Sequence, residues 1–178
     1  MNARLTKFDW IRHGLHTLAN EGPNALSVGP MSVKLNVSRG SFYWHFKDIA
    51  DFRGQLLETW QEISTDRVIQ DLDERPGEPD RLRHLLRSAL TGTRTLDQAI
   101  RTWAAQDKAV ATIVGAVDAR RIARIAKLLV EAGVKSEPAM HRATVLYWAY
   151  LGQVLVMDPR HSTLPGAALD EISDLFMT

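Results

Sequence analysis

The sequence of 178 residues contains no cysteine. A chain without cysteine forms no disulfide, has no thiolate nucleophile and builds no zinc finger, which is typical of the reducing cytoplasm. It also contains no run of about 18 apolar residues, the length that a membrane-spanning helix needs. The first residues lack the basic and then apolar pattern of a signal peptide. We therefore expect a cytoplasmic protein that does not enter a membrane.

The common signatures of enzymes and cofactor sites are absent as well. The sequence has no P-loop, no dinucleotide-binding fingerprint, no Gly-x-Ser-x-Gly and no His-Glu-x-x-His. His13 and His16 are three residues apart on an expected helix, but no third ligand stands at a suitable spacing, so surface or capping roles are favoured over metal binding. The sequence predicts no catalytic residues, no cofactor and no metal site.

The charges are distributed unevenly along a chain whose composition is that of an ordinary globular protein, with 45% hydrophobic and 24% charged residues. The whole chain has a formal net charge of +1. Residues 1–53 hold seven Lys or Arg against four Asp or Glu, a net charge of +3, and the rest of the chain carries −2. A basic first segment on a slightly acidic body indicates that this segment alone meets an anionic polymer.

Apolar residues recur at helical spacing between breaks of Gly and Pro, and no segment alternates with the period of a strand. The pattern predicts an all-α protein of about nine helices. Their expected ranges are 6–20, 27–35, 38–46, 48–73, 80–91, 96–106, 110–132, 136–157 and 165–176. The breaks between the later helices fall at residues 75–79, 92–93 and 158–159, and at Gly133 as a left-handed stop.

The first three helices have local signals for their ends. Thr6 with Asp9 three residues later predicts a capping box, Ser27 and Ser38 are expected N-caps, and Asn36 suits a left-handed turn. The residues expected to be buried in the first two helices are Phe8, Ile11, Leu15, Leu18, Val28, Met31 and Leu35. Two short helices joined by such a turn form a helix-turn-helix.

Two segments of this region carry the most specific pattern in the chain. They are Leu26-Ser27-Val28 and Leu35-Asn36-Val37-Ser38-Arg39-Gly40-Ser41-Phe42-Tyr43-Trp44-His45-Phe46-Lys47. The capped first helix, the small-Val-Ser turn and the Tyr-x-His-Phe ending closely resemble the DNA-binding signature of the TetR family of transcriptional regulators. The resemblance covers about residues 6–53.

The resemblance implies that residues 1–47 form a helix-turn-helix DNA-binding domain. The implied DNA contacts are Ser27, Ser38, Arg39, Ser41, Tyr43, Trp44, His45 and Lys47. It places Val37, Phe42 and Phe46 in the core of this domain. The physical chemistry agrees, because a short polar helix with aromatics beside cations suits the major groove and its phosphates. The alternative for Tyr43 and Trp44 is packing of one helix against another.

Two positions depart from the family pattern. Gly29 stands where members often carry a basic residue, and Ile49 stands where a Lys often holds a phosphate. Arg39 is able to reach either a guanine edge or the DNA backbone. The departures therefore affect the list of contacts and leave the fold unchanged.

The resemblance also implies what residues 48–178 do. They would form a ligand-binding and dimerisation domain, and a small hydrophobic or aromatic effector would shift the helix at 48–73 and release a repressor from its operator. Two alternatives remain: a ligand-independent DNA-binding protein of the same fold, and a helical enzyme.

The larger domain offers two sets of candidate residues. The expected lining of the ligand site is Trp60, Leu86, Leu90, Ile100, Trp103, Val114, Val117, Arg121 and Tyr147. Arg121 lies near an apolar stripe, so it should pair with Asp97 or Asp107, or else bind an anionic group of a ligand. The expected homodimer interface is Tyr147, Tyr150, Leu151, Gly152, Val154, Leu155, Leu169, Ile172 and Phe176.

Overall fold

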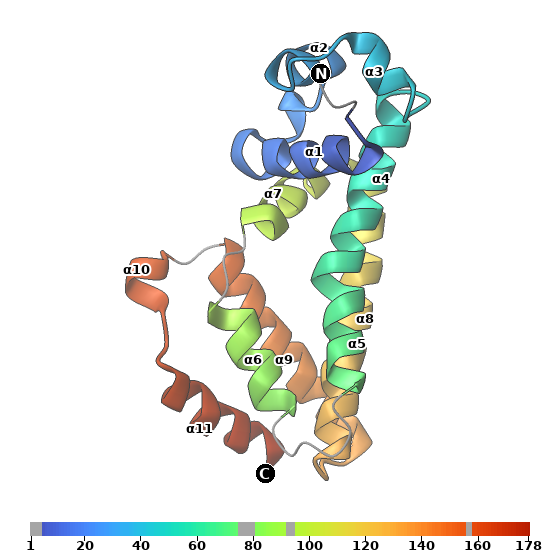
Figure 1. The fold of residues 1–178 in the computed structure, drawn as a ribbon. Coiled ribbons are helices and arrows are strands. Elements are labelled where there is room, and N and C mark those ends of the chain that lie inside the picture. Colours follow the sequence, from blue (N-terminus) through green and yellow to red (C-terminus); the bar gives the residue numbers. More distant parts are fainter. Residues whose placement is uncertain (1–4, 75–80, 92–94, 156–157) are drawn as a thin grey trace. The chain divides into compact units, whose positions relative to one another are not determined.

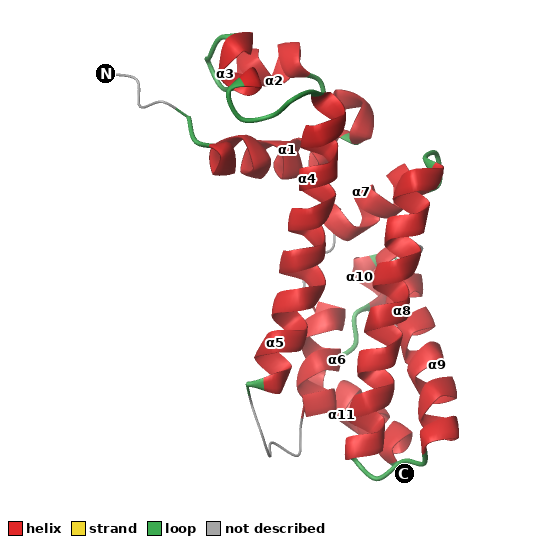
Figure 2. Ribbon diagram, turned by 90° about the vertical axis from the view of Figure 1, so that its right-hand side faces the viewer, coloured by secondary structure: helices red, strands yellow, loops and turns green. Residues whose placement is uncertain are grey.

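The structure, a computed structural model, describes residues 5–74, 81–91, 95–155 and 158–178. Within these ranges every regular element is a helix and no strand occurs (Figure 2). The all-α fold class predicted from the sequence is confirmed. Among the same residues, no helix combines the length and the apolar character needed to cross a membrane. The expected breaks at 75–79 and 92–93 lie outside the described residues.

The chain divides into two compact units that do not follow the order of the sequence. Unit 1 comprises residues 1–66 and 95–114, and unit 2 comprises residues 67–94 and 115–178. The boundary at residues 47 and 48, drawn on function, lies inside unit 1 and stays a prediction. The segment predicted to bind DNA and residues 95–114 therefore belong to one compact body.

Unit 1 is built from five α-helices, the start of a sixth and two short helical turns (Figure 1). They are α1 (Lys7–Glu21), η1 (Pro23–Ala25), α2 (Val28–Lys34), α3 (Arg39–Tyr43), α4 (Ile49–Gln61), η2 (Glu62–Asp66), α7 (Thr95–Ala104) and the start of α8 (Lys108–Glu131). The expected helix at 48–73 has the predicted extent, but the π-helical turn η2 interrupts it before α5 (Arg67–Asp73). A π-helical turn widens the backbone by one residue per turn.

Helix α1 begins and ends at the predicted signals. The Thr6 hydroxyl accepts a hydrogen bond from the Asp9 N–H, and the Asp9 carboxylate accepts one from the Thr6 N–H, 2.9 Å away. A hydrogen bond from the Thr6 hydroxyl to the Asp9 carboxylate at 2.6 Å, together with the one from the Thr6 N–H, holds the pKa of Asp9 below its usual range, and Arg12 adds a smaller lowering effect. At the other end, Gly22 adopts a φ of 80°, which favours glycine. The capping box is confirmed.

The buried face of α1 is rotated relative to the expected one. Phe8 was expected in the core, but 68% of its surface is exposed, whereas Trp10 is fully buried. Gly14 is buried where α1 crosses α4: a Cβ added there would lie 2.5 Å from Phe52 Cζ and 2.9 Å from Leu56 Cδ2. Only a residue without a side chain permits this approach, so Gly14 sets the spacing of the two helices.

Helix α7 packs on α1 and is tied to α4 by a buried polar contact. The indole N–H of Trp60 donates to Asp97 Oδ1 at 2.8 Å, and both side chains are buried. Arg101, one turn along α7, has its Nε 3.5 Å from Asp97 Oδ2. A buried carboxylate needs such partners, because burying it without them is costly.

Unit 2 has its own apolar core. Its helices are α5, α6 (Arg81–Thr91), the remainder of α8, α9 (Ser136–Leu155), α10 (Pro159–Ser162) and α11 (Gly166–Met177). The buried side chains that meet in it include Leu72, Leu82, Leu86, Ile125, Leu129, Ala143, Leu146 and Tyr147. Gly133 has a φ of 101° and ends α8 as predicted, whereas α10 was not expected from the sequence.

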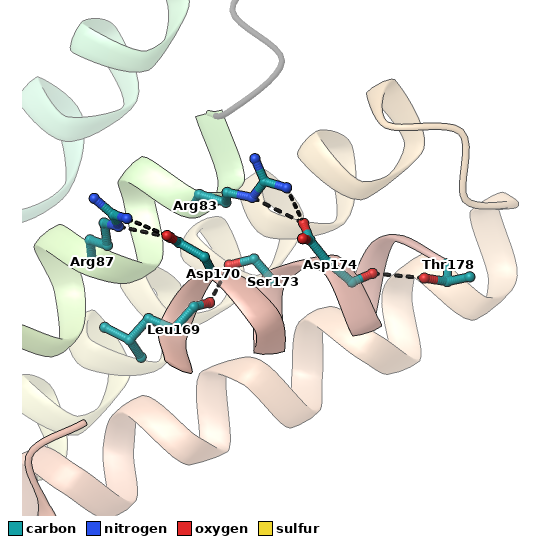
Figure 3. Close-up of polar contacts among 7 residues, drawn as sticks. All are labelled: Arg83, Arg87, Leu169, Asp170, Ser173, Asp174 and Thr178. Carbon is teal, nitrogen blue, oxygen red and sulfur yellow. Dashed lines mark hydrogen bonds and ion pairs between the residues drawn. The ribbon is translucent and has the colours of Figure 1, made fainter. Parts of the chain in front are cut away.

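Helix α11 lies along α6 and is held there by two ion pairs (Figure 3). Arg83 pairs with Asp174, and Arg87, one turn further, pairs with Asp170. The hydrogen bond and the charge of Arg87 lower the pKa of Asp170. Leu169 turns inward and is buried. The last helix is thus bound by an apolar contact flanked by exposed charge pairs.

Candidate nucleic-acid interface

The turn between α2 and α3 has the predicted left-handed geometry. Asn36 adopts a φ of 53°, and its N–H donates to the Val33 carbonyl at 3.1 Å. The next N–H, of Val37, donates to the Ser32 carbonyl at 3.0 Å. These bonds close the end of α2 and direct the chain into α3, which gives the helix-turn-helix that the sequence predicts.

The inner side of α3 is fixed by a cluster of aromatic rings. Phe42 is fully buried, with its ring centre 5.3 Å from that of Trp10, 5.0 Å from that of Phe46 and 5.4 Å from that of Phe52. Phe46 is buried as well and packs edge-on against Phe52 at 4.8 Å. Phe42 and Phe46 are therefore core residues, as expected, and they hold a helix of only five residues in place.

The outer side of α3 presents the next two aromatics to solvent. Tyr43 is 60% exposed and Trp44 is 74% exposed, although they directly follow the buried Phe42 in the sequence. Packing between helices, the alternative considered for Tyr43 and Trp44, does not bury either ring. Large aromatics at this exposure on a rigid helix are available to stack or to donate a hydrogen bond to a partner.

The serine hydroxyls at the helix starts are not used for capping. Ser27 and Ser38 both have the extended backbone of an N-cap, but neither side chain makes a capping hydrogen bond. Ser41 lies on the half-buried part of α3. The three predicted contact serines therefore lie at or near the starts of α2 and α3, and the hydroxyls of Ser27 and Ser38 make no capping hydrogen bond to the backbone.

His45 makes a contact within the motif. Its Nε2 lies 3.0 Å from the carbonyl oxygen of Leu5, which only accepts, so this nitrogen is the donor. His45 thus ties the segment before α1 to the end of α3, and its contact with DNA stays a prediction.

The cations of the first segment divide into paired and unpaired groups. Lys34 forms an ion pair with Glu21, and Arg12 pairs with Asp9 at 3.2 Å. The two pairs cancel within the net charge of residues 1–53, and the exposed cations without an ion-pair partner among the described residues of this segment are Lys7, Arg39 and Lys47.

Arg53 is a basic residue of this segment that faces inward. Its Nη2 donates to the Leu26 carbonyl at 3.3 Å, just before α2, and its guanidinium carbon lies 6.0 Å from the ring centre of Trp103. Arg53 thus joins α4, α7 and the start of the helix-turn-helix. The sequence alone did not reveal this position, because an Arg one residue after Phe52 looks like a solvent-exposed charge.

The residues predicted to line a ligand site fall into both units. Trp60, Ile100, Trp103 and Val114 are buried in unit 1, and Leu86, Val117 and Tyr147 are buried in unit 2, where Leu90 and Arg121 are half-buried. Within the described residues, no group of three His, Asp or Glu side chains could hold a metal ion.

Arg121 is part of a polar group within unit 2. Its Nη1 donates to the Tyr147 hydroxyl at 3.4 Å, and that hydroxyl donates to Asp118 Oδ1 at 2.6 Å. The guanidinium carbon also lies 5.9 Å from the ring centre of Tyr150. Within unit 2 this hydrogen-bonded chain reaches the carboxylate of Asp118. The expected pairing of Arg121 with Asp97 or Asp107 stays a prediction.

The predicted dimerisation residues include three that unit 2 itself buries, namely Tyr147, Val154 and Leu169. Tyr150, Leu151, Gly152, Ile172 and Phe176 are half-buried, and Leu155 is exposed. The sequence missed Trp148, which is 64% exposed on α9. A helix that is apolar all round hides which of its faces meets the core.

The comparisons with known proteins agree with this geometry. A proposed transcriptional regulator from Streptomyces coelicolor A3(2) covers 97% of the chain with a TM-score of 0.65 and 18% identity, and 98% of that protein is covered. A proposed TetR-family transcriptional regulator from a Rhodococcus species covers 97% of the chain with a TM-score of 0.68 and 18% identity, with 99% of that protein covered. The chain therefore has the fold of a TetR-type regulator, and the resemblance found in the sequence is confirmed.

A curated relative matches part of the chain. The HTH-type transcriptional regulator AcrR of Shigella flexneri is 28% identical over 85 residues, which make up 45% of this chain and 40% of the relative. The match thus spans less than half of that relative's length. No known family profile matches the chain.

Proposed function

We propose that the protein is a transcriptional regulator that binds double-stranded operator DNA through α3. The observation that carries the proposal is the two-sided build of this helix: Phe42 is locked in the aromatic core, while Tyr43 and Trp44 point to solvent. Arg39 and Lys47 stand at either end of the same short segment with no ion-pair partner among the described residues. A rigid, exposed helix with aromatics between cations suits the major groove and the phosphates beside it.

The proposal is tested by the salt dependence of DNA binding. The operator is first selected from a random duplex library with the wild-type protein, and binding is then measured by fluorescence anisotropy at several salt concentrations. Lys47→Ala removes one phosphate contact per subunit, or two per dimer, and should reduce the slope of log K against log salt by nearly two units. Tyr43→Phe removes a hydroxyl and should weaken binding without changing this slope.

A matched control is Lys135→Ala in unit 2, because Lys135 is exposed and lies far along the chain from α3. Its slope should equal that of the wild type. Both α3 variants should unfold at the wild-type temperature, because the replaced groups are exposed. An unchanged slope for Lys47→Ala would remove this residue from the interface, and a wild-type protein without affinity for any duplex would overturn the function.

The second part of the proposal is that the protein acts as a homodimer through α9. A stripe along this helix exposes Met140, Val145, Trp148 and Leu155, and a Cβ added at the half-buried Gly152 between them would touch nothing within 4 Å. We infer that a second copy of this chain covers the stripe, because the proposed function requires a dimer. Two helix-turn-helix units reading half-sites about one helical turn apart, roughly 34–36 Å, require a symmetric dimer.

The dimer is tested by light scattering on Trp148→Glu, which places a charge on this stripe. The expected result is a folded monomer, and Val130→Glu is the control, because Val130 is also an exposed apolar residue of unit 2 but lies on α8. A Trp148→Glu protein that stays a dimer would move the interface away from α9.

The third part is that a small hydrophobic or aromatic molecule binds and releases a repressor from DNA. The support is the resemblance of the helix-turn-helix to a ligand-responsive family, together with a polar group, Arg121 with Tyr147, set among apolar side chains of unit 2. Such sparse polar groups in an apolar setting orient ligands in small-molecule sites. Operator-bound protein should be released by members of a panel of aromatic compounds.

The same panel separates this part from the alternatives. Arg121→Ala should lose the response to an active compound, whereas Arg120→Ala, the neighbouring exposed residue of α8, should keep it. If no compound changes DNA affinity and wild-type binding is intact, the ligand-independent regulator is the correct function. Reporter expression that rises when the gene is deleted identifies a repressor.

A further inference from the structure

Gly29 and Arg39 lie against one another, although they come from different helices of the helix-turn-helix. A Cβ added at Gly29 would lie 3.1 Å from Nη2 of Arg39, 3.5 Å from its Cζ and 3.6 Å from its Nε. Three atoms of one planar group at such similar distances place the guanidinium across the bare backbone of Gly29. No other side chain comes nearer to that place.

The contact joins two positions that otherwise have no explanation. Glycine is a weaker helix former than alanine, and Gly29 is the second residue of α2, with an ordinary helical backbone that does not need glycine. Arg39 is the first residue of α3, is exposed, and has no ion-pair partner among the described residues. The absence of a side chain at 29 is what lets the guanidinium lie there.

The position of this charge decides what it can touch. In a helix-turn-helix the first helix crosses the DNA backbone and the second enters the major groove. The Arg39 side chain starts on the second helix, but its charged end lies over the first. It is therefore directed to the side of the motif that faces phosphates, and away from the base edges that α3 faces.

We propose that Gly29 is a positioning residue that seats the Arg39 guanidinium on α2, where it binds a phosphate and contributes no base recognition. The proposal rests on the proposed DNA-binding function. Arg39 of α3 then supplies the positive charge at position 29 of α2, where the chain has a glycine. One arginine thus makes the DNA-backbone contact for the neighbouring helix. Sequence preference is then left to Ser41, Tyr43 and Trp44.

The first experiment compares two duplexes: the selected operator and a random sequence of the same length. Arg39→Ala should weaken binding to both by the same factor, and it should reduce the slope of log K against log salt by nearly two units per dimer. A loss on the operator that clearly exceeds the loss on the random duplex would show that Arg39 reads a base, and would overturn the proposal.

The second experiment is a double-mutant cycle between the two positions. Gly29→Ala places a Cβ 3.1 Å from Arg39 Nη2 and moves the guanidinium slightly, and Gly29→Leu fills its place. Binding should weaken in that order when Arg39 is present, and neither change should matter when residue 39 is alanine. Gly54→Ala is the control, because a Cβ there would touch nothing within 4 Å.

The outcomes separate this inference from the function on which it rests. Equal effects of Gly29→Leu with and without Arg39 would give position 29 its own contact and overturn the positioning role, while DNA binding stands. Thermal unfolding of each variant confirms that the helix-turn-helix is retained, and Gly29→Ala, the smallest change, is expected to be at least as stable as the wild type. A wild-type protein that binds no duplex would overturn both.

Discussion

Replacing Gly14 by alanine tests whether the crossing of α1 and α4 is as close as the structure has it. The added Cβ would lie 2.5 Å from Phe52 Cζ and 2.9 Å from Leu56 Cδ2, whereas ordinary contacts begin at 3.4 Å. The Phe52 ring cannot turn aside, because it is fully buried between Phe42 and Phe46. The helices must therefore separate by a large part of an ångström.

The expected loss follows from two opposing effects. Overpacking a core costs about 1–3 kcal/mol, and two atoms nearer than 3.0 Å favour the upper end, while alanine regains about 1 kcal/mol of helix propensity. The net loss for Gly14→Ala is then about 2 kcal/mol, which lowers the unfolding temperature of a chain of this size by about 4–8 °C. Far-UV circular dichroism during heating measures it.

The matched control is Gly54→Ala in the middle of α4, where nothing lies within 4 Å of the added Cβ. It gains the same helix propensity without a collision, so the unfolding temperature should rise by about 2–4 °C. Opposite signs for two identical substitutions identify the crossing as the cause. If Gly14→Ala is as stable as Gly54→Ala, the close approach does not exist.

Three further changes probe individual contacts. Trp60→Phe removes the donor to the buried Asp97 carboxylate and should cost about 1–3 kcal/mol in urea unfolding; an unchanged midpoint would exclude this bond. The pKa of the Asp9 carboxyl is lowered in the folded state. The ionised carboxylate therefore stabilises the fold fully when the pH is above the unfolded-state pKa of about 4, and this stabilisation is lost as the pH falls through the folded-state pKa. The difference in stability between wild type and Thr6→Ala should therefore shrink in acid, and a constant difference would contradict the capping box. Asp170→Asn removes one exposed ion pair of α11, so its small effect on the unfolding temperature should disappear at high salt, and persistence there would indicate a packing defect instead.

The sequence predicted features that depend on a few neighbouring residues. The cap at Thr6, the left-handed turn at Asn36 and the stop at Gly133 all appear in the structure, because each requires only a local hydrogen bond or a backbone angle. The inward Phe42 and Phe46 were expected through the family resemblance. Two of the three predicted core residues are therefore confirmed, whereas Val37 is half-buried.

The sequence failed where burial depends on small residues. The predicted stripe of α1 was Phe8, Ile11, Leu15 and Leu18. Ile11 and Leu18 are buried, but the buried face also includes Trp10, Gly14 and Thr17. These lie at positions i, i+4 and i+7, so the helical pattern was present once glycine and threonine are admitted to the core. On α9 the apolar residues surround the helix, so the sequence does not show which face is buried. Only the structure shows that Tyr147 is buried and that its neighbour Trp148 is exposed.

The return of the chain to unit 1 at residues 95–114 limits how this protein can be taken apart or recombined. A fragment ending at residue 66 would expose to water the face of α1 that α7 covers. It would also lack Asp97, the hydrogen-bond partner of Trp60. A transfer of the proposed DNA interface to another protein of this fold would therefore need two separate gene segments, the first for residues 1–66 and the second for residues 95–114. The compact unit that holds this proposed interface is discontinuous in the sequence.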